Sequence, residues 1–379
     1  MAIRVLVVTN ILSPYRVPLF KHLARSTALD VSVIALAESE ANRHWRGAGN
    51  VQEFGYRVLV GWHVFLRRLE MPIHLNWGLL RALWRVRPDV VMTSGYDQLA
   101  YWEAFLYAKL ARKPYLLWNG TTSLSTGTVG GPIGWLKRRI VRGADGYVAY
   151  GSQAAEYLVA FGAPRERIHV GVNTVDMAFY RERTTAERRA PSFRAKRVLY
   201  PEVLLLYVGQ LIERKGVLQL LEALRKLDDP SVGLVVVGGG PQESALRRFC
   251  KEANLRNVYF EGFHQPEELP EYYALADLLV VPSREEVWGL VVNEALAGGL
   301  YVLCSDRAGA AYDVIEDGWN GRLFSPSDVD RLAEIINETR RQLEEIRVRR
   351  EEISERACRE FGIERSAKAF LDAIQAVSS

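Results

Sequence analysis

Two carboxylates, Glu286 and Glu294, stand eight positions apart across a predicted strand-to-helix turn. The apolar run 278–282 is typical of a buried parallel strand, and residues 291–297 predict a helix that starts at once. Backbone N–H groups at such a helix start attract phosphate, because they lack partners within the helix and lie at its positive end. Carboxylates beside them suit sugar hydroxyls, Glu286 those of a hexose and Glu294 those of ribose. The pattern therefore indicates a nucleotide-sugar site, although acidic residues also occur near helix starts for the ~0.3–1 kcal/mol of dipole stabilisation alone.

A second charged turn follows the predicted strand 204–208 and ends in Arg214 and Lys215, before an amphipathic helix at 217–227. Lys215 can reach a diphosphate from this turn. Breaking the anomeric bond of a sugar nucleotide places charge on the departing diphosphate, and fixed cations stabilise that transition state. A turn of three glycines, 238–240, precedes Pro241. It suits a close approach of phosphate, but it suits any tight turn equally well.

The spacing of Glu286 and Glu294, followed by Ala-Leu-Ala-Gly-Gly, resembles the E-x7-E signature of retaining glycosyltransferase family 4. This is the glycogen synthase-like superfamily, also called glycosyl transferases group 1. The resemblance extends over about residues 1–375 and is most specific from 204 to 325. It implies an α/β protein of the GT-B fold. In that fold two Rossmann-like domains with parallel sheets face each other across a cleft, and a C-terminal helix crosses back to the N-terminal domain.

The resemblance also implies roles for individual residues. Glu286, Lys215 and Asn119 would be catalytic. The implied donor-binding residues are Gly209, Gln210, Arg214, Phe263, His264, Val287, Trp288, Gly289, Leu290 and Glu294.

Two positions depart from the family pattern. The family usually has Arg where Gln210 stands, and several members have His where Asn119 stands. Asn cannot act as a general base. Retaining transfer would then depend on the departing phosphate oxygen to take the proton of the acceptor.

Residues 9–20 leave the first predicted strand, and in a Rossmann-like sheet such a loop opens at the edge where ligands bind. Many family members have Gly-Gly here, whereas this chain resembles the subset with Pro-Tyr-Arg. We expect Pro14, Tyr15 and Arg16, together with Tyr96 after a later strand, to lie on the acceptor or phosphate side. A capping or domain-bridging salt bridge would suit Arg16 equally well.

Alternating strand and helix patterns predict two parallel sheets. The expected strands are 5–9, 31–36, 90–93, 115–118, 146–150 and 168–170 in the first half, and 204–208, 232–237, 258–261, 278–281 and 301–304 in the second. We predict an acceptor-binding domain at 1–180, a charged linker at 181–198, a donor domain at 199–360 and a crossover helix at 361–379.

The chain has 379 residues, 49% of them hydrophobic and 25% charged, which is enough for two cores. Three widely spaced cysteines favour a reducing compartment, and no apolar run reaches 18 residues, so we expect a cytoplasmic protein.

The two halves differ in charge. Residues 1–180 carry 21 Lys and Arg against 12 Asp and Glu, whereas residues 181–379 carry 28 against 33. The basic segment 135–142 and the tryptophan-rich span 62–84 indicate contact with the inner face of an anionic membrane or with an acidic acceptor. The alternative is an ordinary solvated helix face beside a core stripe. No nucleic-acid-binding motif accompanies the charge, so we expect no nucleic acid partner.

We therefore expect a metal-independent retaining hexosyltransferase. It would move a hexose from a UDP- or GDP-linked sugar to a glycan or lipid-linked acceptor, as in polysaccharide biosynthesis, with no cofactor besides this donor. One alternative is a catalytically inactive partner subunit, which Gln210 and Asn119 would suit. Another is a nucleotide-sugar epimerase, which would turn over donor without acceptor.

Metal independence can be tested before any acceptor is known. We find no Asp-x-Asp placed to hold a metal and no histidine spacing typical of a metal site. The rise in melting temperature caused by the matching sugar nucleotide should therefore be the same in EDTA as in Mg²⁺. A rise seen only with Mg²⁺ would show that a metal bridges donor and protein.

Overall fold

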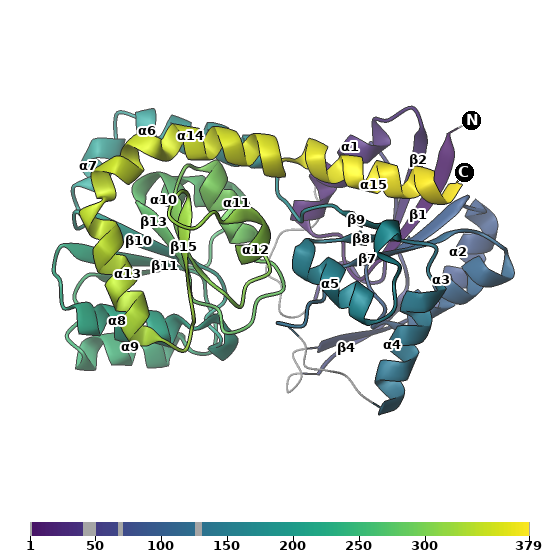
Figure 1. Ribbon diagram of the computed structural model, residues 1–379, viewed down its shortest axis with the longest axis horizontal. Coiled ribbons are helices and arrows are strands. Elements are labelled where there is room, and N and C mark those ends of the chain that lie inside the picture. The colour runs from purple at the N-terminus through teal and green to yellow at the C-terminus, as the bar shows by residue number, and fades with distance from the viewer. Residues whose placement is uncertain (1, 41–50, 67–70, 126–130, 379) are drawn as a thin grey trace. The chain divides into compact units, whose positions relative to one another are not determined.

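The computed structural model describes residues 2–40, 51–66, 71–125 and 131–378. The chain folds as two compact units. Unit 1 comprises residues 1–173 and 363–379, and unit 2 comprises residues 174–362. Both are α/β units built on a parallel sheet (Figure 1), as predicted.

Unit 1 contains a seven-stranded parallel sheet in the order β3-β2-β1-β6-β7-β8-β9. Its strands are β1 (Ile3–Thr9), β2 (Leu29–Ala35), β3 (Gly55–Val58), β6 (Val90–Thr93), β7 (Tyr115–Asn119), β8 (Gly146–Ala149) and β9 (Ile168–Val170). Its helices are η1 (Pro14–Arg16), α1 (Val17–Ala24), α2 (Leu79–Val86), α3 (Leu99–Leu110), α4 (Gly131–Gly143), α5 (Ser152–Ala160), η2 (Arg165–Arg167) and α15 (Ile363–Ser378). A separate antiparallel pair is formed by β4 (Gly61–Leu66) and β5 (Met71–Asn76). The sequence patterns missed β3, β4 and β5.

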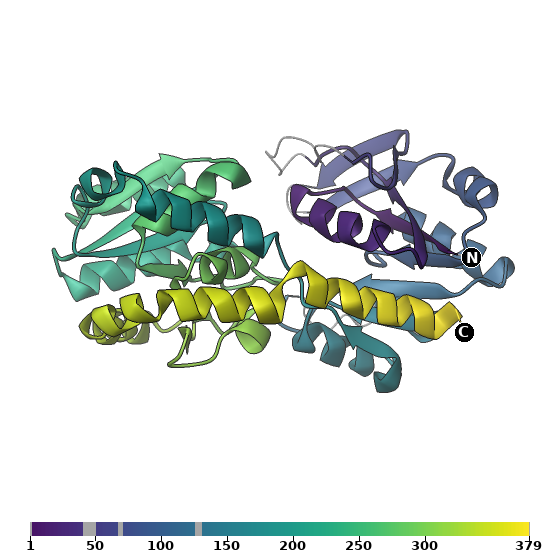
Figure 2. The ribbon, with the colours of Figure 1, turned by 90° about the horizontal axis from the view of Figure 1, so that it is seen from above.

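Helix α15 belongs to the core of unit 1, although it ends the chain. It packs beside α1 (Figures 1 and 2). Phe370 and Ile374 are buried against the sheet, and the Phe370 ring lies 5.1 Å from the Trp118 ring on β7. The predicted return of the last helix to the N-terminal domain is confirmed.

Unit 2 contains a six-stranded parallel sheet in the order β12-β11-β10-β13-β14-β15. Its strands are β10 (Val203–Val208), β11 (Val232–Val237), β12 (Val258–Gly262), β13 (Leu278–Val281), β14 (Tyr301–Ser305) and β15 (Gly321–Phe324). Its helices are α6 (Met177–Arg189), α7 (Phe193–Arg197), η3 (Glu213–Lys215), α8 (Val217–Leu227), α9 (Glu243–Glu252), η4 (Pro266–Glu268), α10 (Leu269–Leu275), α11 (Leu290–Ala297), α12 (Ala311–Val314), α13 (Val329–Arg341) and α14 (Leu343–Phe361). No helix among the described residues is both long and apolar enough to cross a membrane.

The charged stretch 181–198, expected to be a linker, forms most of α6 and all of α7 within unit 2. Tyr180 and Thr184 on α6 are buried. Arg188 donates to the carbonyls of Gly298 at 2.7 Å and Tyr273 at 3.1 Å. The arginines of this stretch suggested a linker, but Arg188 is bonded to backbone carbonyls inside unit 2.

A second charge cluster fixes α14 to the sheet. Asp277, just before β13, is almost fully buried and accepts hydrogen bonds from Arg350 at 2.7 Å and Arg347 at 3.0 Å. Arg197 and the amide of Leu204 donate to its other oxygen. Burial alone would raise the pKa of Asp277, but these donors outweigh it and hold the pKa below its usual value.

Replacing Asp277 by Asn should therefore destabilise unit 2. The change leaves three arginines around a neutral side chain and should cost about 3–5 kcal/mol in urea unfolding. Because the folded-state pKa is depressed, the stabilisation by the wild-type carboxylate is complete above about pH 4 and is lost as the pH falls further. The Asp277→Asn variant should lack this part of the acid dependence.

The exposed Asp330, which pairs with Lys226 on the surface of unit 2, offers a matched control. Asp330→Asn should change stability by less than about 1 kcal/mol. Equal effects of the two substitutions would contradict the role assigned to Asp277.

Candidate functional site

The loops that leave the strands of unit 2 are joined along the carboxyl edge of the sheet. The Leu211 amide donates to the Gly239 carbonyl at 3.0 Å, which joins the loops after β10 and β11. The Arg284 amide donates to the Arg214 carbonyl at 2.8 Å, which joins the loops after β10 and β13. The Glu286 amide in turn donates to the Arg307 carbonyl, after β14. Four loops are thus joined into one rim, on which the predicted donor-binding residues Gly209, Gln210, Arg214 and 287–289 lie.

At this rim Lys215 and Glu286 form an ion pair, although 71 positions separate them in the chain. Lys215 ends η3 after β10, and Glu286 lies in the loop after β13. The two strands are neighbours in the sheet. Both side chains are largely buried, so the pair is less screened by water than a surface ion pair. Sequence reasoning assigned these two residues separately, and the structure brings them together.

Glycines allow the loops of the rim to lie this close. A Cβ atom on Gly216 would lie 2.0 Å from the Pro282 carbonyl oxygen, and one on Gly238 would lie 1.8 Å from the Gly209 carbonyl oxygen. Both glycines also have positive φ, at 69° and 139°. Gly239, by contrast, faces open space. Two of these glycines are therefore explained by packing alone.

The turn before α11 is held by Trp288. Its side chain is buried, and its indole N–H donates to Asn293 Oδ1 at 2.9 Å. Gly289, in the left-handed region at φ 96°, begins the helix, and Val287 is exposed beside it. Leu290 is the first helical residue. Val287, Trp288, Gly289 and Leu290 are the four predicted donor contacts of this turn. Among them, the buried Trp288 side chain supports the turn from inside unit 2.

Glu294 lies inside unit 2 and not on its surface. Its exposed fraction is 0%, and its carboxylate accepts a hydrogen bond from the Tyr273 hydroxyl at 2.5 Å. Tyr273 lies on α10, so this bond joins α10 to α11. In this structure one oxygen of the carboxylate is engaged by Tyr273.

The remaining donor candidates occupy the ends of β10 and β12. The Gln210 carbonyl accepts from the Tyr207 hydroxyl at 2.7 Å. Burial and the Glu286 carboxylate raise the pKa of Tyr207, and Arg214 opposes them, which places the Arg214 charge in the same neighbourhood.

Beyond β12, the Phe263 side chain is 45% exposed. His264 contacts the Tyr272 hydroxyl through Nε2 at 2.8 Å. Phe263 is therefore about half exposed, and His264 is engaged by Tyr272.

In unit 1, Arg16 lies at the carboxyl ends of the central strands. It follows Pro14 and Tyr15 in η1. Its guanidinium donates to the hydroxyls of Thr9 at 2.5 Å and Tyr150 at 2.6 Å, and it lies 4.4 Å from the centre of the Trp118 ring. No carboxylate in the described part of unit 1 pairs with Arg16, so its charge is held in place but not neutralised. The alternative of a salt bridge within this unit is not what the structure shows.

Two other candidates in unit 1 are buried. Asn119 is 1% exposed, and its amide donates to the Thr121 carbonyl at 3.1 Å. The Tyr96 hydroxyl bonds that of Tyr157 at 3.2 Å. Both side chains serve packing and local hydrogen bonding in this structure.

The sequence analysis missed a buried polar chain at the same edge of unit 1. Glu40 accepts from Asn10 Nδ2 at 2.6 Å and lies 3.5 Å from Nε2 of His74. Nδ1 of His74 lies 3.0 Å from Nδ1 of the exposed His63. Burial and His74 both lower the pKa of His63. The signal in the sequence was two short, mostly apolar segments, 61–66 and 71–76, each with one histidine, which is compatible with paired strands.

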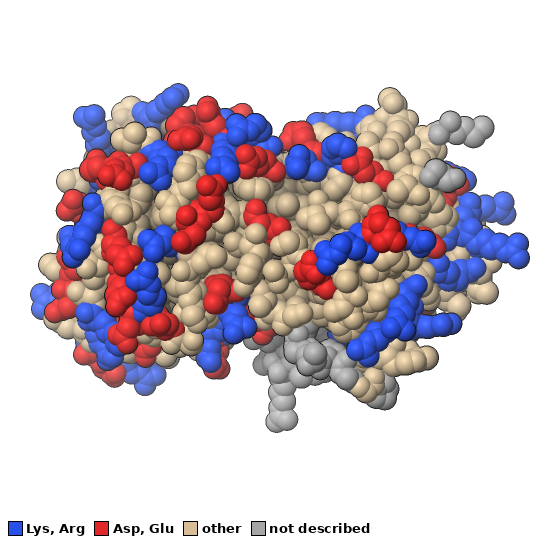
Figure 3. Space-filling model, viewed as in Figure 1, with Lys and Arg blue, Asp and Glu red and all other residues tan. Residues whose placement is uncertain are grey.

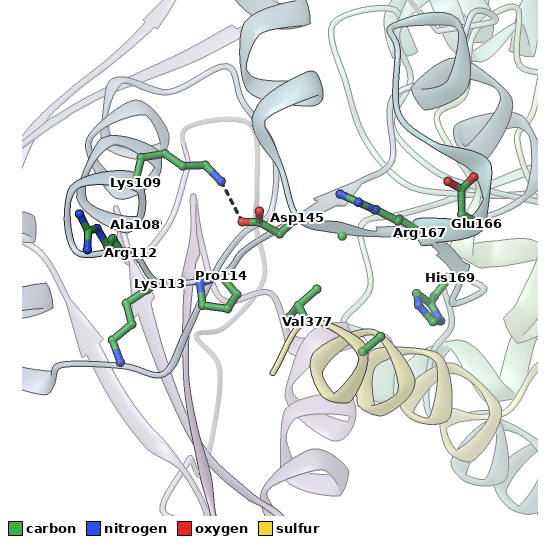
Figure 4. Close-up of a pocket in the computed structure, with 12 residues that line it drawn as sticks. Ala108, Lys109, Arg112, Lys113, Pro114, Asp145, Glu166, Arg167, His169 and Val377 are labelled. Atoms are coloured by element: carbon green, nitrogen blue, oxygen red, sulfur yellow. Dashed lines mark hydrogen bonds and ion pairs between the residues drawn. The ribbon is translucent and has the colours of Figure 1, made fainter. Parts of the chain in front are cut away.

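A cavity of about 470 Å³ lies at the opposite edge of the same sheet, near the amino ends of β7, β8 and β9 (Figure 4). Lys109, paired with Asp145, and Arg167 line it. The charged groups of Arg112 and Lys113 point away from Arg167 (Figure 4). These cations do not converge on one point, and the cavity is separate from the candidate site.

The described residues contain no cluster of three or more His, Cys, Asp or Glu side chains arranged to hold a metal ion. The one Asp-x-Asp pair, Asp328 and Asp330, has a structural role. Asp328 caps α13 by accepting from the Arg331 amide at 2.9 Å, and Asp330 pairs with Lys226.

Comparison with known families matches both units. Residues 13–174 match the family described as Glycosyl transferase 4-like domain, and residues 191–357 match Glycosyl transferases group 1. Together the two matches take in most of the chain.

Relatives were found among curated proteins. The GDP-mannose-dependent alpha-(1-6)-phosphatidylinositol monomannoside mannosyltransferase of Mycobacterium tuberculosis is 27% identical over 362 residues, 88% of each chain. An uncharacterized glycosyltransferase of Methanocaldococcus jannaschii is 30% identical, and the match covers 46% of this chain and 45% of that one. The sulfoquinovosyl transferase SQD2 of Arabidopsis thaliana is 26% identical over 70% of this chain and 52% of its own. The chain thus spans about half the length of the last two relatives.

Among solved structures, HepE of Anabaena in complex with UDP has a TM-score of 0.77 at 18% identity, covering 98% of this chain and 100% of that one. The same protein in complex with UDP-glucose gives a TM-score of 0.74. The sucrose-phosphate synthase of Thermosynechococcus elongatus gives 0.73 at 18% identity, covering 97% of this chain and 98% of that one. At these identities the likeness establishes the two-domain GT-B fold.

The glycine contacts of the rim lead to a paired prediction. Gly238→Ala should lower the free energy of unfolding by about 2 kcal/mol or more, because its Cβ would meet backbone and its φ is unfavourable. Gly239→Ala, one position away in open space, should stay within about 0.5 kcal/mol of the wild type. Urea unfolding of both variants checks this. Equal losses would show that the loops are not packed as described.

Proposed function

Because the chain belongs to the glycosyltransferases of group 1 with a glycosyl transferase 4-like N-terminal domain, we propose that it is a retaining hexosyltransferase. It moves a hexose from a nucleoside diphosphate sugar bound by unit 2 to an acceptor bound by unit 1. The observation that carries the proposal is the Lys215–Glu286 ion pair on the rim of unit 2. A cation for the diphosphate and a carboxylate for the hexose meet there at the ends of neighbouring strands.

In the absence of donor, each member of this pair satisfies the charge of the other. We propose that the bound donor separates the ion pair and becomes the new partner of both side chains. The Lys215 ammonium turns to the diphosphate, and the freed Glu286 carboxylate accepts hydrogen bonds from hexose hydroxyls. A preformed pair keeps both groups oriented and avoids an unpaired buried charge before binding. Arg214, close to Gln210, supplies the second positive charge that the family usually takes from an Arg at the Gln210 position.

The transfer itself breaks the bond between the anomeric carbon and the diphosphate oxygen and forms a bond from that carbon to the acceptor oxygen. The acceptor proton goes to the departing phosphate oxygen on the same face of the sugar. Asn119 cannot take that proton. This scheme needs no metal, because Lys215, Arg214 and backbone N–H groups stabilise the leaving charge.

The proposals for the donor base and for the acceptor are based on the relatives. HepE is described in complex with UDP and UDP-glucose, and the mycobacterial relative as GDP-mannose-dependent. UDP- and GDP-sugars are therefore the first donors to test, with the half-exposed Phe263 as the candidate contact for the base. The mycobacterial enzyme acts on a phosphatidylinositol monomannoside, which favours a glycan or lipid-linked acceptor. Work at the cytoplasmic face of a membrane would fit such an acceptor.

A second candidate function is a binding or partner subunit without transfer activity. Gln210 in place of a family Arg and the buried Asn119 favour it. Such a subunit would still bind nucleotide if the rim is intact, or none if it acts only through a partner. An epimerase would instead consume donor without acceptor.

The decisive measurement is thermal unfolding with UDP-, GDP-, ADP- and TDP-sugars and the free diphosphates, followed by calorimetric titration of the best ligand. Lys215→Ala should weaken binding of that ligand by about 10–100-fold, the loss expected for one charge-assisted contact. Lys226→Ala is the matched control, because Lys226 is an exposed lysine of unit 2 whose partner is Asp330. It should bind like the wild type.

Two outcomes would overturn parts of the proposal. Equal affinity in Lys215→Ala and Lys226→Ala would remove Lys215 from the diphosphate site. No response of the wild type to any nucleotide would favour the partner-subunit alternative.

A further inference from the structure

The hairpin of β4 and β5 turns an apolar face to solvent, whereas such hairpins normally turn their polar face outward. Register pairs His63 with His74 and Trp62 with Leu75. Since neighbouring residues of a strand point to opposite faces, the two histidines share one face, and Trp62, Val64 and Leu75 share the other. His74 is buried and joined to Glu40, so this face turns inward at His74, while His63 stays exposed. The tryptophan face is therefore the outer one.

Exposure confirms this arrangement. Trp62 is 70% exposed, Val64 is 53% exposed and Leu75 is 41% exposed. Trp77, which follows β5, is 54% exposed, and its ring lies 5.4 Å from that of Trp62 in an edge-to-face contact. A hairpin of a water-soluble sheet normally turns its polar side outward. Here two tryptophans and two aliphatic side chains face solvent together.

Helix α2 extends the same surface along the chain. Leu80 and Trp84, one helical turn apart, are 43% and 58% exposed. Leu80 lies three positions after Trp77, so their Cα atoms lie within about 11 Å of each other. Arg81 and Arg85 are exposed between and beside them. We call Trp62, Val64, Leu75, Trp77, Leu80 and Trp84 the tryptophan surface.

The charge along this segment, residues 55–88, is mostly positive, although Asp89, the residue that follows it, is a partly exposed carboxylate that pairs with Arg4 and Lys113. Residues 55–88 of the sequence contain six arginines against one glutamate. The described residues of this span contain no carboxylate side chain at all. Figure 3 shows Lys and Arg gathered on the part of unit 1 that holds α2 and α3, whereas unit 2 has the two signs mixed. Partners with negative charge are favoured and positively charged partners are disfavoured.

We propose that the tryptophan surface docks unit 1 on an anionic lipid bilayer. Indole rings partition to the boundary between headgroups and acyl chains, because they are apolar with one polar N–H. Arginines beside them pair with lipid phosphates, and together these are the two signals that give stable peripheral binding. A protein partner would be expected to meet a polar rim of both signs around such an apolar patch. The excess of arginine over carboxylates along the segment 55–88 favours lipid over protein.

This inference deepens the membrane location proposed above and rests on it. It does not depend on the transfer chemistry. The assay below contains no sugar nucleotide, so a failure of vesicle binding is distinguishable from a failure of donor binding.

The test is co-sedimentation of the full chain with vesicles of phosphatidylcholine alone and of phosphatidylcholine with 30% phosphatidylglycerol. The wild type should bind the anionic vesicles, and binding should weaken at 0.5 M salt. The triple variant Trp62→Gln/Trp77→Gln/Trp84→Gln should bind at least about tenfold more weakly. Arg81→Gln/Arg85→Gln should lose a similar factor on anionic vesicles only.

Matched controls lie on unit 2. Val348, which is 85% exposed on α14, can be changed to Gln to test the loss of an apolar side chain remote from the surface. Arg194→Gln/Arg359→Gln removes two exposed arginines from the same unit. Both should bind vesicles like the wild type. The triple Phe variant of Trp62, Trp77 and Trp84 should keep binding but lose the tryptophan quenching caused by brominated lipids. Equal melting temperatures show that each variant is folded.

Three results would overturn the proposal. One is wild-type protein that stays in solution with both kinds of vesicle. Another is equal vesicle binding by the wild type and the triple Gln variant. The third is a dimer in sedimentation velocity that the triple Gln variant abolishes, which would assign the surface to a second copy of the chain.

Discussion

The ion pair between Lys215 and Glu286 depends on one constraint, the parallel alignment of β10 and β13. In a parallel sheet every strand ends at the same edge, so loops that are far apart in sequence meet there. Backbone hydrogen bonds from loop to loop then fix the spacing of the side chains, and Gly216 and Gly238 make the close contacts sterically possible. The rim is rigid because its backbone polar groups bond one another.

Charged groups have two distinct uses in unit 2. Asp277, surrounded by Arg197, Arg347 and Arg350, fixes the sheet to α14 and is almost inaccessible. The Lys215–Glu286 pair lies at the rim and remains partly open to solvent. A buried carboxylate with several donors is costly to disturb, whereas a partly solvated pair can exchange its partner for a ligand at smaller cost.

Unit 1 has a different set of polar groups at its strand ends. Its strand ends carry hydroxyls, amides and the cation of Arg16, and the carboxylate of Glu40 is buried beneath His74 and Asn10. Such neutral and cationic groups suit hydroxyl-rich or anionic ligands. The buried His74, joined to Glu40, also explains why the hairpin turns its tryptophans outward, since a two-stranded sheet has only two faces.

The sequence by itself determined the parallel α/β class, the existence of two such units, the return of the last helix and the residue types at the strand ends. The strands, the helices and the residue types follow from local periodicity and from a motif whose members are close in the chain, whereas the return of the last helix was implied by the family resemblance. Tertiary structure decided which residues meet. It paired Lys215 with Glu286 and buried Glu294 against Tyr273. It also folded the charged stretch 181–198 into helices and joined Glu40 to His74. Such outcomes depend on contacts between segments tens of residues apart, which no local pattern encodes, because burial and pairing are set by the sheet order and not by spacing along the chain.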